Sequence, residues 1–443
     1  MSAARNHAEF GECLSAARHS AADDPVAHGA IGDFCSARGD YPAALDAYDE
    51  AVQLDPLNPR YRYNRAAVRR FLGELEGAEA DLDSVIAASP NDAEAWHLRS
   101  DLRVQTADRN HVVELELRSG RGFQDWRQEV QIRFALAKEY EDLGQYRDSW
   151  RALHAGSAVR RKNLKYDVRV DLQTVDWIRE AFPAAVQDNS DCEPSGPIFI
   201  VGMPRTGTTL LERILGRHCD VHAAGELADF AVAVVAAAQR AAGRIDLSRP
   251  ALIAASARAN FAALGADYLA RTGPRTGNRP RFVDKMPLNY LYCGLIRRAL
   301  PNARILHVTR HPLATCYAGY KTLFAQGYPF SYDLMEIADY YAGYRRLMAH
   351  WHQTLPGQIL DVSYERLITD PAGEAERVFE FCGLKRGGGY VDVPGGEWQT
   401  TTASASQVRR PIYRTSIDLW RHYAVELAPV SERLAAAGIA GID

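Results

Sequence analysis

The stretch from residue 197 to 211, PIFIVGMPRTGTTLL, constrains this chain more than any other. It begins with four apolar residues, Ile198 to Val201, of the kind found in a buried parallel strand. A turn bounded by Gly202 and Gly207 follows and leads into an amphipathic helical pattern. Glycines let backbone N–H groups approach an anion, and a helix N-terminus attracts negative charge. The stretch therefore predicts a phosphate-binding loop.

The polar residues of this loop distinguish it from an ATP-hydrolysing loop. Thr208 stands where a Walker A loop has lysine, and the cation inside the loop is Arg205. The pattern resembles the 5′-phosphosulfate loop of sulfotransferases, and its arginine is more similar to the tyrosylprotein branch than to the cytosolic small-molecule branch. The alternative is a glycine turn without a ligand. The resemblance implies that the donor's 5′ end contacts five loop residues: Arg205, Thr206, Gly207, Thr208 and Thr209.

Length and composition are those of a globular protein with two domains. The chain has 443 residues, of which 47% are hydrophobic and 24% charged. A net charge of −4 gives no reason to expect nucleic acid or an anionic membrane as a partner. Seven scattered cysteines without a CxxC pair favour free thiols and predict no metal site. No signal peptide or membrane span is evident, so we expect a cytoplasmic location.

Residues 1–165 show an internal repeat. Ala44 and Ala78, like Pro56 and Pro90, are 34 residues apart, the period of the tetratricopeptide repeat. A further copy at 130–163 and a degenerate unit between 93 and 129 bring the expected number of units to four. We therefore predict an all-α tetratricopeptide superhelix.

Repeat arrays bind peptides or proteins on a concave face, or form dimers, and the sequence leaves these uses open. The arginine-rich segment 118–127 is either a binding surface or a solvated loop between repeats. A connecting helix and polar linker are expected over 166–196, and the second domain over 197–443. Within that domain the alanine-rich segment 231–277 is predicted to be helical.

A candidate general base lies in residues 218–230, HCDVHAAGELADF. Glu226 follows the loop after one helix and a turn, so its carboxylate is expected on the same edge of the sheet. Tyrosylprotein sulfotransferases have their base in a glycine–glutamate context, and Gly225-Glu226 is similar to it. The alternative is a glutamate at a helix N-terminus. Asp229 and His222 are the other candidate bases.

A positively charged residue follows each of two later predicted strands. Lys285 follows a short strand at the edge where open α/β folds bind ligands. The resemblance implies that it stabilises the sulfonate in transfer and the leaving phosphate; the alternative is a surface ion pair with Asp284. Arg310 follows a second strand, 304–309, and its planar guanidinium suits a phosphate. The resemblance implies that Arg310 binds the 3′-phosphate of 3′-phosphoadenosine 5′-phosphosulfate (PAPS), which ATP lacks.

One position departs from the family. A serine is expected eight residues after this arginine, and the chain has Ala318 there. We expect the missing hydroxyl to weaken donor binding by about 1–2 kcal/mol. Four neighbours are candidate replacements: Thr315, Tyr317, Tyr320 and Lys321.

The C-terminal part completes the expected donor site. Tyr364 follows a third strand, and the resemblance implies that it contacts the adenosine. By the same likeness Ser404 stabilises the transition state and Arg421 reaches the 3′-phosphate, while the nucleotide is lined by Ser406, Gln407 and Arg409. Without the resemblance, the segment 402–413 is interpreted as a mobile, basic, solvent-facing loop. A loop that folds over the bound donor fits both interpretations.

The combined pattern resembles bacterial tetratricopeptide-repeat sulfotransferases. It implies a repeat array followed by an α/β, P-loop-like domain with a parallel central sheet. The implied reaction moves a sulfonate from PAPS, without a metal, to an acceptor hydroxyl on a peptide tyrosine, glycan, lipid or small molecule. The alternatives are a P-loop nucleotide kinase and a repeat scaffold whose transferase domain has weakened.

Overall fold

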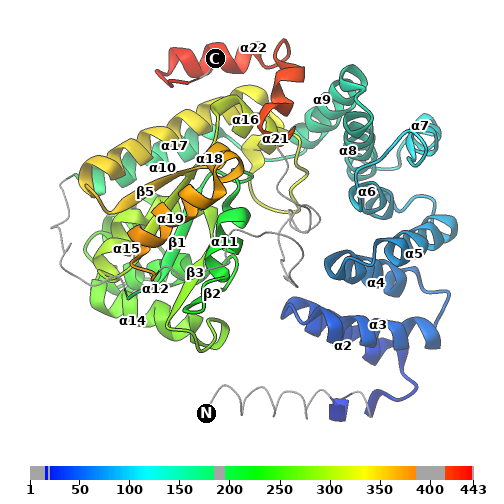
Figure 1. Cartoon of the computed structure of the whole chain (residues 1–443), viewed down its shortest axis with the longest axis horizontal. Coiled ribbons are helices and arrows are strands. Elements are labelled where there is room, and N and C mark those ends of the chain that lie inside the picture. Colours follow the sequence, from blue (N-terminus) through cyan, green and yellow to red (C-terminus); the bar gives the residue numbers. More distant parts are fainter. Residues whose placement is uncertain (1–14, 18–19, 184–194, 386–414, 442–443) are drawn as a thin grey trace. The chain divides into compact units, whose positions relative to one another are not determined.

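The computed structural model describes residues 15–17, 20–183, 195–385 and 415–441 (Figure 1). They form two compact units. The first contains the chain up to Lys165 together with the segment Leu323–Tyr332, and the second contains the other described residues from Tyr166 onward. Among the described residues, no helix is both long and apolar enough to span a bilayer.

The first unit is built from helices in sequence order (Figure 1). They are α2 (Pro25–Ala37), α3 (Tyr41–Leu54), α4 (Pro59–Leu72), α5 (Leu75–Ala88), α6 (Ala93–Asp101), α7 (Val112–Gly120), α8 (Trp126–Asp142) and α9 (Tyr146–Lys162). The turns inside three pairs contain a left-handed glycine, namely Gly39, Gly73 and Gly144. The helical repeat predicted for this part of the chain is confirmed.

Close helix approach depends on small residues. Ala44 and Ala51 of α3 are fully buried. A Cβ on Gly32 of α2 would lie 2.6 Å from the Tyr48 ring, so the tyrosine of α3 fills a groove that only glycine leaves open. This contact fixes the spacing of the first helix pair.

One arginine of the segment 118–127 is structural. Arg118 is 4% exposed, and its guanidinium donates to the carbonyls of Pro90 and Gly122. Because it is buried in the repeat array, neither interpretation of the segment, a binding surface or a solvated loop, holds for this residue.

The second unit begins with α10 (Val168–Ala181) and contains a five-stranded sheet. The strands are β1 (Ile198–Gly202), β2 (Val221–Ala223), β3 (Arg281–Asp284), β4 (Arg304–Thr309) and β5 (Ile359–Ser363). Their order is β2-β3-β1-β4-β5, and all neighbouring strands are parallel. The predicted α/β domain with a parallel sheet is confirmed, and all five strands end on the same edge.

Helices cover both faces of this sheet. On one face Ile200, Val308 and Val362 pack against α11 (Thr208–Gly216) and α19 (Pro371–Cys382). On the other face, the Phe199 ring packs against the rings of Phe230 and Tyr268, which lie at the border of and within the helical segment 231–277. The helices not yet named are α12 (Asp229–Ala242), α13 (Arg249–Ser256), α14 (Phe261–Thr272), α15 (Cys293–Ala299), α16 (Pro312–Tyr320), α17 (Leu334–Thr354), α18 (Tyr364–Thr369), α21 (Thr415–Asp418) and α22 (Ala428–Ala436).

Candidate active site

The predicted loop joins β1 to α11 and is closely walled. A Cβ on Gly202 would lie 2.7 Å from the carbonyl oxygen of Val308 in β4. A Cβ on Gly207, which has φ 97°, would lie 2.3 Å from the Tyr364 ring. Both positions therefore require glycine, and the loop backbone lies where an anion can approach the N-terminus of α11.

The threonines of the loop have different surroundings. Thr206 donates its hydroxyl to the carbonyl of Met203 at 2.8 Å, so this proton stabilises the loop itself instead of facing an anion. Thr208 and Thr209 are the first two residues of α11 and are buried. Arg205 has φ 66°, a left-handed conformation that costs a non-glycine residue about 1–3 kcal/mol and is typical of functional turns.

A buried lysine lies at the end of β3. Lys285 is 0% exposed, and its Nζ lies 2.8 Å from Glu226 Oε1 and 3.8 Å from Glu212 Oε2. Asp284 is not its partner, because that carboxylate is buried and accepts from Tyr268 Oη at 2.9 Å. The surface ion pair considered for Lys285 is therefore wrong. A fully buried ammonium between two carboxylates is a costly arrangement, which points to a functional site.

Glu226 and Glu212 are held together by the backbone. Glu212 Oε1 accepts from the N–H of Gly225 at 2.9 Å, and the carbonyl of Gly225 accepts from the N–H of Lys285. Burial raises the pKa of Glu212, while the Lys285 charge opposes this rise. The Glu226 side chain is 39% exposed, and α12 begins only at Asp229. The alternative placement of Glu226 at a helix N-terminus is therefore wrong.

The other two candidate bases lie in other contacts. Asp229 is in α12 and pairs with Arg275. The His222 ring lies against Gly277, and burial lowers its pKa. The buried Asp284 is not exposed to a substrate, although burial raises its pKa to about 7. Of these carboxylates, Glu226 alone pairs with Lys285 and is also partly exposed.

Arg310 lies on the other side of the loop. Its Nη1 donates to the Arg205 carbonyl at 3.0 Å, and its Nη2 donates to the carbonyl of Ser416. The guanidinium lies 4.7 Å from the centroid of the Tyr364 ring, and Tyr364 Oη is 2.7 Å from Ser416 Oγ. Arg310 therefore joins the loop between β1 and α11 to the backbone at Ser416.

The remaining C-terminal predictions have mixed placements. Arg421 pairs with Asp418 at 3.1 Å and stacks on Trp420, whose ring in turn stacks on His311 beside Arg310. The Trp420 ring thus lies in contact with both Arg421 and His311. Four predicted positions lie outside the described residues: Ser404, Ser406, Gln407 and Arg409.

The environment of Ala318 shows how α16 is packed. Thr315 donates its hydroxyl to backbone carbonyls of its own turn, and the Tyr317 ring stacks on Tyr423. Tyr320 is buried, and Lys321 Nζ lies 5.4 Å from the centroid of the Tyr317 ring. In this structure the candidate replacements for the missing serine are thus engaged within α16 or against its neighbours.

Two site residues are absent from the sequence-based predictions. Glu212 could have been found, because it lies four residues after Thr208 on the buried face of α11, where an acidic residue is unexpected. Ser416 contributes its carbonyl and hydroxyl. No sequence pattern marks Ser416 as a site residue, because Arg310 contacts its main-chain carbonyl, which every residue has.

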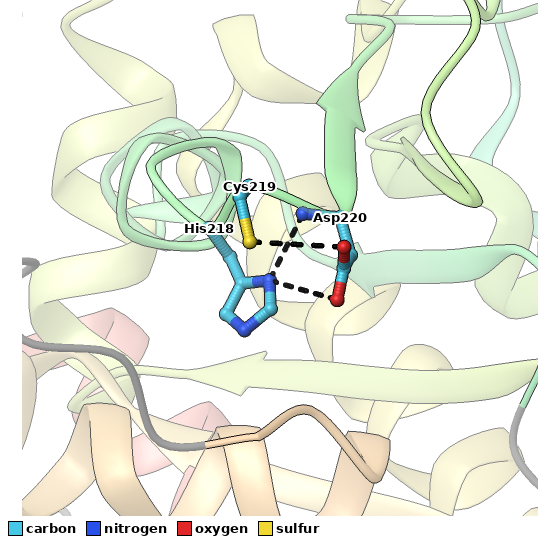
Figure 2. A group of neighbouring side chains, drawn as sticks. All are labelled: His218, Cys219 and Asp220. Atoms are coloured by element: carbon cyan, nitrogen blue, oxygen red, sulfur yellow. Dashed lines mark hydrogen bonds and ion pairs between the residues drawn. The ribbon is translucent and has the colours of Figure 1, made fainter.

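A turn after α11 brings together potential metal ligands (Figure 2). His218, Cys219 and Asp220 are consecutive, and His218 Nδ1 accepts from the backbone N–H of Asp220 at 3.2 Å. Its Nε2 therefore carries the proton and donates to the carbonyl of Lys385. Both ring nitrogens are thus engaged by the main chain, which stabilises the turn and leaves no unengaged His218 nitrogen to face an ion.

Comparison with known proteins agrees with this architecture. A model described as "Sulfotransferase family" matches residues 197–386, and a "TPR repeat" model matches residues 32–70. An uncharacterised protein of Aquifex aeolicus is 31% identical over 399 residues, which cover 88% of this chain and 52% of that protein. The chain thus spans about half the length of this relative.

Two further matches are named after sulfotransferases. A putative protein-tyrosine sulfotransferase of Caenorhabditis briggsae is 27% identical over 238 residues, 50% of this chain and 80% of that protein. The solved sulfotransferase domain of the Synechococcus PCC 7002 olefin synthase has 18% identity and a TM-score of 0.38, covering 56% of this chain and 98% of that domain.

The sulfotransferase model covers the loop between β1 and α11, and it covers Lys285 and Arg310, which follow β3 and β4. The repeat model covers part of the repeat helices. Residues 197–386 therefore form a domain that matches the sulfotransferase family, and a tetratricopeptide repeat precedes it.

Proposed function

We propose that this protein transfers a sulfonate group from PAPS to an acceptor hydroxyl. The observation that supports this most is the fully buried Lys285 ammonium, held 2.8 Å from the partly exposed Glu226 carboxylate. It places a fixed positive charge and a proton acceptor side by side, at the edge of the sheet that also holds the phosphate loop. Sulfonate transfer needs both of these groups.

The loop fits the 5′ end of such a donor. Gly202 and Gly207 leave no room for a Cβ, so backbone N–H groups can approach an anion without a side chain in the way. Thr208 and Thr209 add hydroxyls at the N-terminus of α11. Together with Arg205 they would hold the phosphosulfate end.

Arg310 fits the other end. Its guanidinium lies over the Tyr364 ring and already donates to two carbonyl oxygens. A 3′-phosphate is a stronger acceptor than a neutral carbonyl, because charge-assisted hydrogen bonds are about twice as strong. Arg310 would therefore exchange its contact with Ser416 for the phosphate when the donor binds.

The chain's own residues then divide the reaction between them. When bound, PAPS supplies the sulfonate, and its S–O bond to the 5′-phosphate breaks as the acceptor oxygen bonds to sulfur. Lys285 and Arg205 would stabilise the charge on the transferring group and on the leaving phosphate. Glu226 would accept the hydroxyl proton, and Glu212 would keep the Gly225–Glu226 backbone in place.

For the acceptor we propose a hydroxyl on a peptide tyrosine as the first class to test. The name of the Caenorhabditis briggsae relative describes that protein as a putative protein-tyrosine sulfotransferase. Repeat arrays also bind peptides or proteins, or form homodimers, so the first unit would recruit the acceptor or pair two copies of the chain. Glycans, lipids and small molecules are the other classes to be compared. We propose that the reaction takes place in the cytoplasm.

The test uses ³⁵S-labelled PAPS and a panel of acceptors from these four classes. Glu226→Gln is expected to lower turnover roughly 10²–10⁴-fold while calorimetry shows unchanged binding of 3′,5′-phosphoadenosine. The matched control is Glu380→Gln, which changes an exposed glutamate of α19. Equal turnover in both variants would overturn the role of Glu226.

Ligand-induced stabilisation separates the transferase from the main alternative. We expect 3′,5′-phosphoadenosine to raise the melting temperature of the full chain. Stabilisation by ATP with Mg²⁺, without any response to 3′,5′-phosphoadenosine, would instead favour a nucleotide kinase. No response to either ligand and no turnover would favour a repeat scaffold with an inactive second domain.

A further inference from the structure

Three potential metal ligands from distant parts of the sequence meet on the second unit, outside the candidate active site. They are His307 in β4, His352 in α17 and Asp361 in β5. Asp361 Oδ1 lies 2.6 Å from His307 Nδ1 and 3.0 Å from His352 Nε2. The ligand atoms of all three residues lie within 4.8 Å of one another.

The sheet register brings two of these residues side by side. His307 and Asp361 are direct partners in the parallel β4–β5 pairing. Their neighbours Leu306, Val308 and Val362 point into the core on the opposite face, so His307 and Asp361 face α17. His352 lies in the last turn of α17 and reaches the same carboxylate.

The buried member of the group has a partner on its far side. His307 Nε2 contacts Tyr344 Oη, and the Tyr344 ring packs edge to face against Tyr290. Metal-binding histidines almost always have such a hydrogen-bond partner on the second ring nitrogen, which orients the ring. The His307 side chain is therefore already oriented with Nδ1 toward Asp361.

The other two members face the solvent. The His352 side chain is 37% exposed and that of Asp361 is 54% exposed, which gives an ion a route to the group. This differs from the turn in Figure 2, where the backbone engages both ring nitrogens of His218. At His307 and His352 the nitrogens that face the group contact a carboxylate side chain, which is itself a metal ligand.

We propose that His307 Nδ1, His352 Nε2 and the Asp361 carboxylate bind a divalent transition metal ion of the Zn²⁺ type. Imidazole nitrogens and one carboxylate suit Zn²⁺, which accepts three protein ligands and a water in tetrahedral geometry. The ion would join α17 to the edge of the sheet.

The geometry requires a small opening of the group. Ligand atoms bound tetrahedrally at about 2.1 Å from zinc lie about 3.4 Å apart. The two present contacts of 2.6 and 3.0 Å would therefore lengthen by roughly 0.8 and 0.4 Å. Rotation of the two partly exposed side chains, Asp361 and His352, supplies this movement. His307 would then carry its proton on Nε2, where Tyr344 Oη accepts it.

The charged side chains near the group have opposite effects on a bound cation. The Asp361 carboxylate favours a cation, whereas the guanidinium of Arg345 acts against a positive charge on His307. Arg377 donates to the backbone carbonyl of Asp361 and pairs with Glu374. The carboxylate is the nearest of these charges to both imidazoles, so it dominates at short range.

The experiment titrates the full, chelator-treated chain with Zn²⁺ and, separately, with Co²⁺. We expect binding of one Zn²⁺ per chain by calorimetry and visible absorption bands of tetrahedral Co²⁺. His352→Gln is expected to weaken binding at least tenfold, and Tyr344→Phe about tenfold, as for other residues that orient a ligand. The matched control is Cys219→Ser in the other group, which leaves binding unchanged.

Several outcomes would overturn the proposal. One is the absence of stoichiometric Zn²⁺ binding, and another is equal affinity in the parent chain and in His352→Gln. Loss of binding in Cys219→Ser would assign the ion to the turn of Figure 2 instead. Because His352 is partly exposed, His352→Gln keeps the fold, and a melting curve recorded in chelator verifies this. Asp361→Asn gives a second test of the carboxylate ligand.

Discussion

The two sides of the candidate active site are built from different chemical groups. On the Lys285 side, charged side chains meet: one buried ammonium and the carboxylates of Glu212 and Glu226. On the Arg310 side, a guanidinium meets main-chain carbonyls and the ring of Tyr364. A carboxylate can accept a proton from a reacting hydroxyl, whereas a main-chain carbonyl cannot. We therefore expect the first side to take part in the proposed chemistry and the second to recognise the shape of the nucleotide.

We expect this difference to separate nucleotide binding from turnover. Changes on the Lys285 side should lower the rate and leave nucleotide affinity nearly intact. Changes on the Arg310 side should lower nucleotide affinity and discriminate between nucleotides. The following predictions test that division, beginning with the largest expected effect.

Removing the buried charge should have the largest effect. Lys285→Met is expected to lower kcat/KM by roughly 10²–10³-fold, because it removes a preorganised charge from the site of transfer. Initial rates with labelled donor measure this loss. Lys162→Met, which changes an exposed lysine of α9, is the control. If kcat is unchanged and only nucleotide affinity falls, the two sides do not divide binding from turnover.

Shape recognition is tested by Arg310→Lys, which keeps the charge and removes the planar fork. We expect affinity for 3′,5′-phosphoadenosine to fall about 10- to 100-fold. Affinity for adenosine 5′-phosphate, which lacks the 3′-phosphate, should change little. Calorimetry with both nucleotides gives the two numbers. An equal loss for both would place Arg310 outside 3′-phosphate recognition.

The Lys285 side should also respond to pH through the neighbouring Asp284. Burial raises the pKa of Asp284 from an ordinary 3.8 to about 7. Between these values the folded chain holds a proton that the unfolded chain releases, so the free energy of unfolding falls as pH rises. The slope from this group is at most about 1.4 kcal/mol per pH unit. Above pH 7 its contribution is constant.

Urea unfolding at pH 5, 6 and 7 measures this slope. Asp284→Asn should make the slope shallower, because an amide does not titrate in this range. The comparison is between slopes, so a general loss of stability in the variant does not affect it. Parallel slopes in both proteins would show that Asp284 does not hold a proton in the folded state.

The smallest effect is expected at position 318. Ala318→Ser introduces the hydroxyl that the resemblance predicts eight residues after Arg310, and it should tighten 3′,5′-phosphoadenosine binding by up to about tenfold. Binding of adenosine 5′-phosphate should stay the same. If the new hydroxyl instead bonds within α16, as that of Thr315 does, neither affinity will change.

The fold was largely predictable from local patterns. The 34-residue spacing of Ala44 and Ala78 indicated the repeats, and the apolar residues Ile198 to Val201 indicated a buried strand. The strand β2 (Val221–Ala223) was not predicted, because three residues give too little alternation to identify. The long α17 was also not among the predicted elements.

The candidate site was only partly predictable. Arg205, Lys285 and Arg310 lie at strand ends, where the topology of a parallel sheet places ligands. The burial of Lys285 was not predictable, because it depends on Glu212 and Glu226, which are distant in sequence. The contact of Arg310 with Ser416 depends on a main-chain carbonyl, which no sequence pattern marks.

The hydrogen bond between the Arg205 carbonyl and Arg310 has a thermodynamic consequence. The carbonyl of Arg205 accepts from Arg310, so the turn proposed to bind one end of the nucleotide is tied to the side chain proposed to bind the other. Residues in contact with each other do not contribute independently to a binding free energy. In a double-mutant cycle with Arg205→Ala and Arg310→Ala, the two losses of affinity should therefore not add.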